Sequence, residues 1–312
     1  DGYRHMHGFS SHTYMWYNEK GEHVWVKWHF KTDQGIKNLT DQQATELAGT
    51  DPDYATRDLF NSIEKGDFPS WTAYVQIMKP EEADNYKFDA FDITKVWFHS
   101  DYPLIPVGKF VLNRNPQNYF NEIEQAAFSP SNFVPGIASS PDKMLQVRLF
   151  SYPDTQRHRL GTNFDQLPVN APKCPMHNYQ RDGQMNTGSQ ESAPNYYPNS
   201  FNGPAPDIKF TPPAIDVQGM AARHEYPLGD IDFVQAGELY SRAMSDYDRS
   251  NLISNIVGHI KNAQQRIQCR QCAIFYKAPP EYGTRVAEGL RLDINKVKSL
   301  AAMNQEDRVK AT

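Results

Sequence analysis

The chain has 312 residues, enough to bury a full hydrophobic core as one large domain or two modest ones. Its 32 Lys and Arg against 37 Asp and Glu give a formal net charge of −5, which argues against nucleic acid or an anionic membrane as a partner. No apolar run approaches the length of a membrane span, and residues 1–7 hold nothing like the apolar core of a signal peptide. Three cysteines are too few for a disulfide framework and suit a reducing compartment. We therefore expect a cytoplasmic protein, with the periplasm and the peroxisome as alternatives.

Residues 1–127 are predicted to be rich in strands. Residues 24–31 alternate apolar and polar side chains with the period of two that is typical of a half-buried strand. Further strands are predicted at 14–17, 71–78 and 105–112, and the turn at 18–21 joins the first two as a hairpin. Helical spacing is found at 39–47 and 54–64. Strands around a helical insertion indicate the α+β class, with a barrel or a strongly bent antiparallel sheet.

Residues 128–228 have little periodicity. Fourteen of the chain's 22 prolines lie between residues 130 and 227, which excludes sustained helix or central strand over most of the segment. Aromatic side chains argue against disorder, and they include Phe164, Tyr179, Tyr196 and Phe201. We interpret this segment as an ordered arm that wraps another surface, such as a second subunit.

Residues 229–312 are predicted to form a helical domain. Ser245 and Asp248 have the spacing of a capping box, and an apolar stripe at 252–260 follows on one helix face. Helices at 263–276 and 294–303 complete a small bundle.

Two groups of residues have metal-site or redox spacing, and each has a simpler interpretation. His5, His7 and His12 lie close together, but no cysteine or convincing carboxylate nearby in the sequence completes a ligand set, so solvated or hydrogen-bonded histidines are favoured. Cys269 and Cys272 form a CxxC pair inside a predicted amphipathic helix, without the preceding strand of a thioredoxin-like motif. A packed helix face is the favoured interpretation of the cysteines.

The spacing of Arg148 and Tyr152 places both on one helix face. A guanidinium one turn before a tyrosine is suited to favour the charged phenolate as an iron ligand. An ordinary helix-surface pair is the alternative, and spacing alone favours that alternative.

The sequence around this pair, RLFSYPDTQRHRLG at 148–161, resembles the haem-ligand signature of the haem-containing monofunctional catalases. Further motifs resemble that family in the same order along essentially the whole chain: KTDQGIKNL at 31–39, DYPLIPVGK at 101–109, NRNP at 113–116, NYQRDG at 178–183 and PNYYPNSF at 194–201. The C-terminal helices, with MSDYDR at 244–249, are most similar to those of the small-subunit bacterial members.

The resemblance implies a catalase fold, in which residues 1–127 are the second half of an antiparallel β-barrel. Residues 128–228 would be the wrapping arm with the haem-ligating helix, and 229–312 the C-terminal helical domain. The implied activity is the haem-dependent disproportionation of hydrogen peroxide to water and oxygen, an oxidoreductase reaction that protects against oxidative stress. Tyr152 would be the catalytic axial ligand of the iron, Arg148 would stabilise its phenolate, and Arg159 would face a propionate of a b-type haem.

The resemblance also implies an NADPH site on the outside of the barrel, with Lys31 as the phosphate partner. The positions that would contact the nucleotide are His7, Phe9, Lys31, Trp97, His99 and Gln235. His7, Phe9 and Ser100 depart from animal members, which have Asn, Tyr and Lys there. Packing of the junction between barrel and helices is the alternative role for these residues.

The family's distal histidine and asparagine, which activate peroxide, belong to an N-terminal portion that we expect to be outside this chain. The chain would then supply the haem-ligand side of a homotetrameric catalase and need the remaining N-terminal portion of the subunit. The alternative is a haem-binding or assembly fragment that is inactive without that portion.

Overall fold

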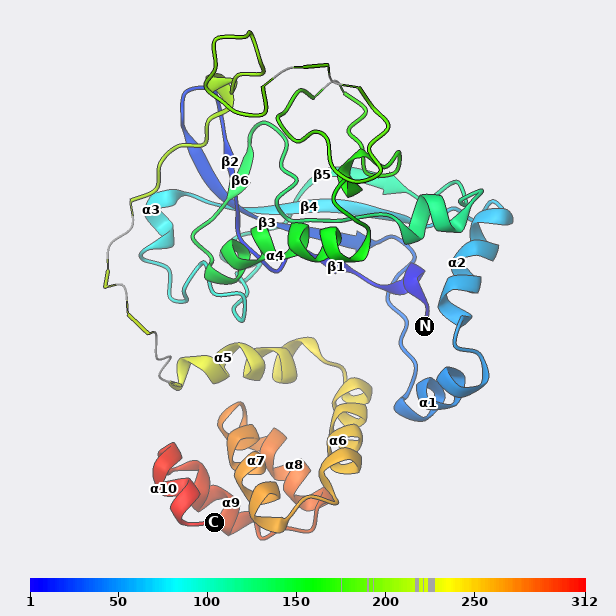
Figure 1. Cartoon of the computed structure of the whole chain (residues 1–312). Coiled ribbons are helices and arrows are strands. Elements are labelled where there is room, and N and C mark those ends of the chain that lie inside the picture. Colours follow the sequence, from blue (N-terminus) through cyan, green and yellow to red (C-terminus); the bar gives the residue numbers. More distant parts are fainter. Residues whose placement is uncertain (175, 190, 193, 217–218, 221, 224–227) are drawn as a thin grey trace. The chain divides into compact units, whose positions relative to one another are not determined.

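The computed structural model describes residues 1–174, 176–189, 191–192, 194–216, 219–220, 222–223 and 228–312 (Figure 1). The chain divides into two units, each with its own core. Unit 1 holds residues 1–38 and 51–217, and unit 2 holds residues 39–50 and 218–312. The predicted division at 127/128 and 228/229 stays a prediction.

Unit 1 is built on a six-stranded antiparallel sheet with the order β5-β4-β3-β2-β6, in which β1 also pairs with β3. The strands are β1 (Gly8–Phe9), β2 (Tyr14–Tyr17), β3 (His23–Thr32), β4 (Ser70–Met78), β5 (Ile105–Val111) and β6 (Ile137–Ser139). In the described residues, β5 and β6 are the two edges and do not pair with each other. The α+β class and the four predicted strands are therefore confirmed, whereas the short β1 and β6 carry too few residues to show a period.

The predicted hairpin between β2 and β3 is confirmed, and its turn has a clear chemical cause. The side-chain oxygen of Asn18 accepts hydrogen bonds from the backbone N–H groups of Lys20 and Glu22. Gly21 has φ of 77°, a conformation that glycine adopts without a Cβ penalty. The turn sets the register that places Tyr17 opposite His23.

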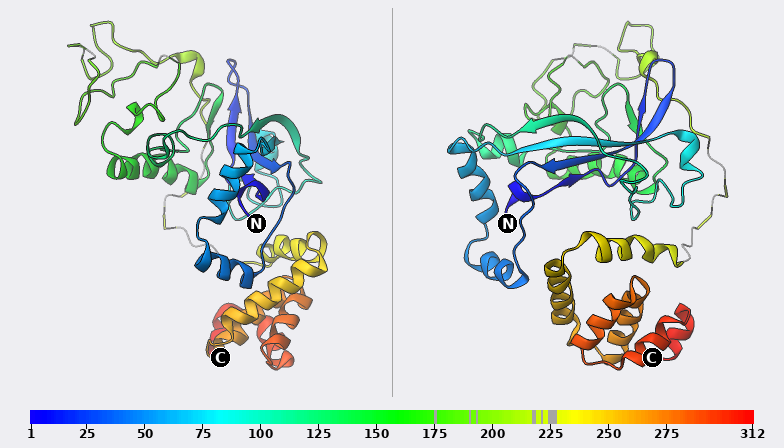
Figure 2. Two further views of the ribbon diagram at one scale, coloured as in Figure 1. Left: turned by 90° about the vertical axis from the view of Figure 1, so that its right-hand side faces the viewer. Right: turned by 180° about the vertical axis from the view of Figure 1, so that it is seen from behind.

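The described residues of unit 1 form three α-helices, α2 (Tyr54–Glu64), α3 (Pro80–Ala83) and α4 (Lys143–Arg159), and a π-helical turn at Phe120–Glu124. The predicted helix at 54–64 is confirmed to the residue. Helix α4 runs through Pro153, which cannot donate a backbone hydrogen bond to the carbonyl of Leu149. The remainder of residues 160–216 has no strand in its described part and only short 3-10 turns at Phe164–Gln166 and Ile208–Phe210, as the extended trace in Figures 1 and 2 shows.

One apolar cluster of unit 1 lies between the sheet and the segment 83–102 that follows β4. Trp25, Met78 and Trp97 are at most 3% exposed and form the centre of this cluster. The segment after β4 therefore covers one part of the sheet, and it brings Trp97 against β3 and β4.

In the part of unit 2 that the structure describes, all regular elements are helices. They are α1 (Asp41–Thr50), α5 (Ile231–Glu238), α6 (Asp246–Ile260), α7 (Gln265–Lys277), α8 (Pro280–Gly289), α9 (Ile294–Ala301) and α10 (Gln305–Lys310). The capping box at the start of α6 is confirmed, because Ser245 Oγ accepts from the Asp248 N–H and Asp248 reaches back to the Ser245 N–H. Figure 2 shows α6 to α10 gathered around one core, with α8 and α10 in addition to the predicted helices. No helix in the described part of the chain is long and apolar enough to cross a membrane.

Candidate functional site

The N-terminus of α4 is fixed by one buried carboxylate. Asp142 is 2% exposed, and its Oδ1 accepts hydrogen bonds from the backbone N–H groups of Met144 at 2.9 Å and Leu145 at 3.1 Å. This is the geometry of a helix N-cap, in which the carboxylate also meets the positive end of the helix dipole. The second oxygen, Oδ2, stays free for a partner outside the helix.

That partner is His12, which comes from the segment between β1 and β2. His12 Nδ1 lies 2.6 Å from Asp142 Oδ2, and His12 Nε2 lies 2.6 Å from Arg148 Nη1. A guanidinium is always a donor, so Nε2 accepts and the ring proton belongs on Nδ1, where it is donated to the carboxylate. The hydrogen-bond network therefore assigns His12 as the neutral Nδ1–H tautomer.

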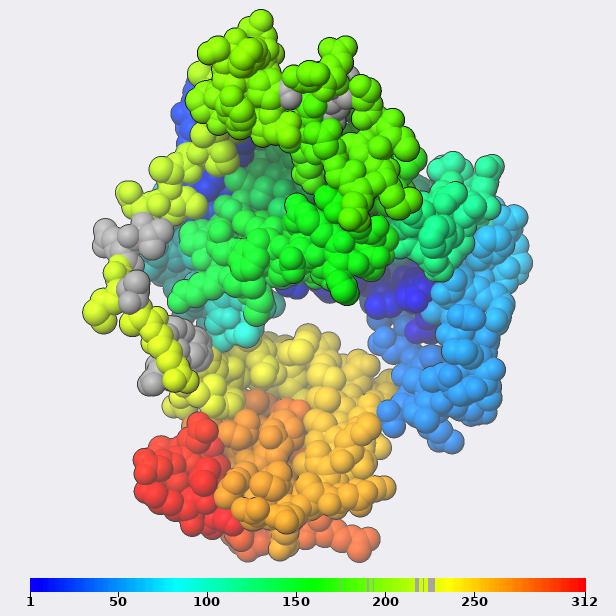
Figure 3. Space-filling model, in the orientation of Figure 1, coloured from blue at the N-terminus to red at the C-terminus, as the bar shows by residue number. Residues whose placement is uncertain are grey.

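Arg148 carries the connection to Tyr152. Its Nη2 donates to the tyrosine oxygen at 3.0 Å, and its guanidinium carbon lies 4.9 Å from the centre of the tyrosine ring. Tyr152 is half-buried on a segment that lies on the visible surface of unit 1, shown in green in Figure 3. We call Asp142, His12, Arg148 and Tyr152 the Asp142–Tyr152 chain: an unbroken hydrogen-bonded series that runs from the helix N-cap to a phenol oxygen.

Sequence reasoning found one half of this series and missed the other. The spacing of Arg148 and Tyr152 was visible, but His12 entered only as one of three nearby histidines and Asp142 not at all. The N-cap position of Asp142 was the available signal. The contact of Asp142 with His12 spans 130 residues, which no local pattern reports.

Tyr14 lies next to the same series. Its ring centre is 6.4 Å from that of His12, with the two planes nearly perpendicular. Burial raises the pKa of Tyr14; Arg148 lowers it and Asp142 raises it. The phenol of Tyr14 is therefore neutral at neutral pH and forms a wall beside His12.

Arg159 at the end of α4 is held by several acceptors. Its Nε and Nη2 both donate to the side-chain oxygen of Gln156, at 2.9 and 2.6 Å. Nη1 donates to the carbonyl of Glu124, and Nη2 also donates to that of Ala126, each at 2.7 Å. Four of the five N–H bonds of the guanidinium are engaged, and one on Nη1 is left.

Four residues of the predicted NADPH site gather around His29 in unit 1. Phe9 lies 5.6 Å and His99 lies 5.7 Å from His29 between ring centres, and Lys31 Nζ lies 4.6 Å from the ring centre of Phe9. His7 stacks edge-on against Phe9 and accepts the Thr32 N–H. Burial lowers the pKa of His29 to about 4, and it lowers the pKa values of His7 and His99 with a further contribution from Lys31. Lys31 is therefore the cation of this group at neutral pH.

The other two predicted contacts are placed differently. Trp97 is 2% exposed and belongs to the unit 1 core, and its role as a nucleotide contact stays a prediction. Gln235 lies in α5 of unit 2.

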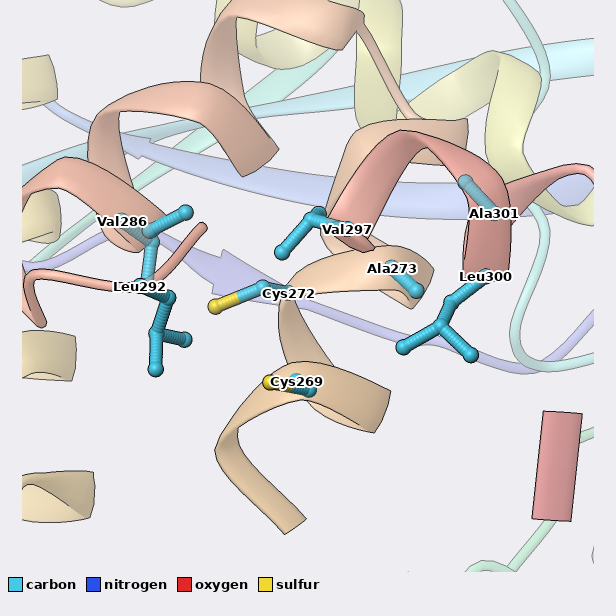
Figure 4. Close-up of a cluster of buried hydrophobic side chains, with 9 residues drawn as sticks. Cys269, Cys272, Ala273, Val286, Leu292, Val297, Leu300 and Ala301 are labelled. Atoms are coloured by element: carbon cyan, nitrogen blue, oxygen red, sulfur yellow. The ribbon is translucent and has the colours of Figure 1, made fainter. Parts of the chain in front are cut away.

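The two alternative motifs are resolved in favour of the simpler interpretations. His5 Nδ1 bonds to the Gly35 carbonyl, and His7 and His12 have the partners given above, so all three are hydrogen-bonded histidines. The described residues contain no group of three His, Cys, Asp or Glu side chains that would hold a metal ion. Cys269 and Cys272 are buried in the unit 2 core, as Figure 4 shows, and burial raises the pKa of Cys272 to about 12.

Comparison with known proteins gives the family. The profile described as Catalase matches residues 1–203, and one described as Catalase-related immune-responsive matches residues 229–290. The chain is 60% identical to the catalase of Methanosarcina barkeri over 99% of its own length and 62% of that protein, and 54% identical to catalase A of Pseudomonas putida over 94% and 61%. It also resembles the solved structure of catalase A from Saccharomyces cerevisiae, with a TM-score of 0.86 and 42% identity over 93% of this chain and 61% of that one.

The chain thus spans about three fifths of the length of the curated relatives it matches. Within that span the α+β fold agrees with the solved catalase structures. The family profile covers well over half of the chain, and the chain therefore belongs to the catalase family.

Proposed function

We propose that this chain binds haem through Tyr152 and provides the iron-ligand side of an enzyme that converts hydrogen peroxide to water and oxygen. The observation that carries the proposal is the hydrogen bond from Arg148 to the Tyr152 oxygen, with Arg148 itself fixed by buried His12 and Asp142. The catalase family uses tyrosine as its haem-iron ligand, and the chain belongs to that family.

The donor set suits the iron of a haem. A phenol oxygen binds iron well when it is charged, and Arg148 offers the cation that stabilises such a charge through a charge-assisted hydrogen bond. Bound haem would supply a redox-active iron that gives two electrons to one peroxide molecule and recovers two from a second. The remainder of the Asp142–Tyr152 chain holds Arg148 in place, because the His12 Nε2 lone pair and the Tyr152 oxygen take one N–H from each of its two terminal nitrogens.

Arg159 is proposed to meet a haem propionate. Its guanidinium is anchored to Gln156 and to two backbone carbonyls, so its position is set before any ligand arrives. One N–H on Nη1 is available for a carboxylate, and the unpaired positive charge adds to that attraction. We assign the haem as the b type, as the family resemblance implies.

The reaction uses hydrogen peroxide as both oxidant and reductant. Two molecules of peroxide give two of water and one of oxygen, so no other reductant is needed. We propose this activity for the whole protein and not for the chain by itself, because the chain spans about three fifths of the length of its relatives.

The test combines a ligand variant with a neighbouring control. Tyr152→Phe removes the only oxygen of that side chain, so we expect the haem content to fall and the absorption spectrum to change. The control is Tyr14→Phe, beside His12, which should keep the haem content and the spectrum of the parent. Oxygen release from peroxide is measured on the same samples. If Tyr152→Phe keeps the parent's haem content and spectrum, the ligand assignment is wrong.

We further propose that NADPH binds to unit 1 near Lys31, His7, Phe9 and His99. The support is the cationic Lys31 beside aromatic and neutral imidazole rings, which suits a nucleotide phosphate and base. Lys31→Ala should weaken NADPH binding measured by fluorescence titration, whereas Lys20→Ala in the exposed hairpin turn should not. Equal affinities for all three proteins would leave packing as the role of these residues.

A homotetramer is proposed from the character of residues 160–216. Among their described side chains, Phe201 is 70% exposed, Ile208 is 83% exposed and Met185 is 96% exposed. Apolar side chains on an extended arm are suited to burial against another subunit. Native mass spectrometry tests this assembly. The cytoplasm stays our predicted compartment.

A further inference from the structure

Lys27 is a buried cation that the proposed haem chemistry does not use. The residue lies in β3 and is 7% exposed, and no carboxylate of the described residues lies within ion-pair distance of its ammonium. Nζ donates instead to the carbonyl of Lys95 at 3.0 Å and to that of Ser11 at 3.4 Å, and it lies 5.4 Å from the ring centre of Trp97. Burying an ammonium against carbonyls and a ring, without a direct counter-ion, is unfavourable. A buried ammonium in this setting therefore calls for a role.

The Ser11 carbonyl belongs to a turn that presents His12. Ser11 has φ of 59°, a left-handed conformation that residues with a Cβ adopt at a cost. The turn is fastened to β3, because Ser10 Oγ accepts the Trp28 N–H and donates to the His12 carbonyl. Lys27 adds a bond to the strained residue itself, directly before His12.

Lys27 is also coupled electrostatically to the far end of the same series. Burial lowers the pKa of Lys27 to about 8, and Asp142 opposes this shift more than Asp92 and Asp89 do. Asp142 is the carboxylate that receives the His12 proton. The Lys27 ammonium thus donates to the Ser11 carbonyl in the turn before His12 and attracts the Asp142 carboxylate that accepts the His12 proton.

We propose that Lys27 is the positioning residue of the Asp142–Tyr152 chain: it holds the left-handed turn at Ser11 and so keeps His12 between Asp142 and Arg148. Its consequence for haem rests on the proposed function, whereas its consequence for His12 does not. Lys27 itself touches neither Tyr152 nor any reacting atom.

The first measurement is made on the haem-free chain labelled with ¹⁵N-histidine. A His12 Nδ1–H that bonds to a carboxylate at 2.6 Å should give a resolved downfield proton resonance, assigned by its loss in His12→Gln. Lys27→Met should remove this resonance or shift both ring nitrogens toward a tautomer mixture. Lys31→Met, four residues later on the same strand and face, should leave it unchanged.

Rescue variants separate positioning from general damage. Lys27→Arg keeps a donor for the Ser11 carbonyl and should retain the resonance. In the double variant Lys27→Met with Ser11→Gly, the left-handed turn no longer carries a Cβ penalty, so the resonance should return in part. If Lys27→Met does not fold by near-ultraviolet circular dichroism, Lys27→Gln is judged by the same criterion.

The second measurement is the rate at which bound haem is lost to an excess of apomyoglobin. Lys27→Met should speed this loss on the order of tenfold, as outer-shell changes commonly do. An unchanged His12 resonance in folded Lys27→Met or Lys27→Gln would overturn the proposal, as would an equal loss in Lys31→Met. If Tyr152→Phe retains haem normally, the proposed function fails while the histidine spectrum still decides the role of Lys27.

Discussion

Replacement of Asp142 by Asn is the sharpest test of the Asp142–Tyr152 chain, because it changes one atom's hydrogen-bonding role. The Asn oxygen is still able to cap α4 by accepting the N–H groups of Met144 and Leu145. Its NH₂ group then faces His12 Nδ1–H, so two donors meet. If His12 changes tautomer to accept there, its Nε2–H meets the donor Arg148 instead. Either way one buried donor is left without an acceptor.

The expected cost follows from these losses. A hydrogen bond to a charged group contributes about 1.5–3 kcal/mol, and breaking a buried charged contact by changing one partner costs about 3–5 kcal/mol. Because the helix cap is retained, we expect Asp142→Asn to lower the free energy of unfolding by about 2–4 kcal/mol, which lies between these two estimates. Haem bound to Tyr152 should also dissociate faster, since Arg148 loses its fixed acceptor.

Urea unfolding followed by tryptophan fluorescence measures this cost, because all five tryptophans lie in unit 1. The matched control is Asp89→Asn, where an exposed carboxylate accepts the Phe91 N–H in a turn that Asn reproduces. We expect this control to stay within about 0.5 kcal/mol of the parent, as surface changes usually do. An Asp142→Asn protein as stable as that control would refute the assigned tautomer and the series built on it.

Three further predictions concern other parts of the chain. The pKa of His29 falls from 6.5 to about 4 on folding, so the unfolded state takes up this proton first and stability is lost as the pH falls from 6.5 to 4. After discounting for partial exposure, His29→Gln should reduce that loss of stability by about 1–2 kcal/mol in acid unfolding curves. Parallel curves for the variant and the parent would contradict the assignment. Cys272, whose pKa is about 12, should stay unlabelled by iodoacetamide at pH 8 in folded protein while exposed Cys174 reacts, and equal labelling by peptide mass mapping would show that the unit 2 core is open. A Cβ at Gly283 would overlap the backbone of Tyr276, so Gly283→Ala should lower the free energy of unfolding by about 1–3 kcal/mol in thermal or urea unfolding. As a control, Gly258→Ala on the open surface of α6 should be neutral or stabilising. The reverse order of stabilities would argue against this packing of α7 on α8.

Features that depend on neighbours in the sequence were predictable. Alternation identified β3 because side chains on successive residues of a strand face opposite sides. The hairpin turn at Asn18–Gly21 and the capping box at Ser245 were equally local, since each is satisfied by groups within a few residues. The pairing of Arg148 with Tyr152 also followed from helical spacing.

Features that depend on distant contacts were not predictable. Strand β6 has three residues and exists only because it pairs with β2. Trp97 matched a nucleotide-contacting position in the sequence, yet folding buries it in the core of unit 1. Proline content correctly indicated a segment poor in regular structure after α4, but α4 itself runs through Pro153.

The sequence by itself determined the family resemblance, the strands and the arginine–tyrosine pair, because motif and period are written in consecutive residues. Only the tertiary structure decided what supports that pair. It brings His12 across 130 residues to Asp142, and it buries Lys27 against the turn that presents His12. The physical reason is that a buried polar group must find its partner wherever the fold places one, and sequence spacing does not record that distance.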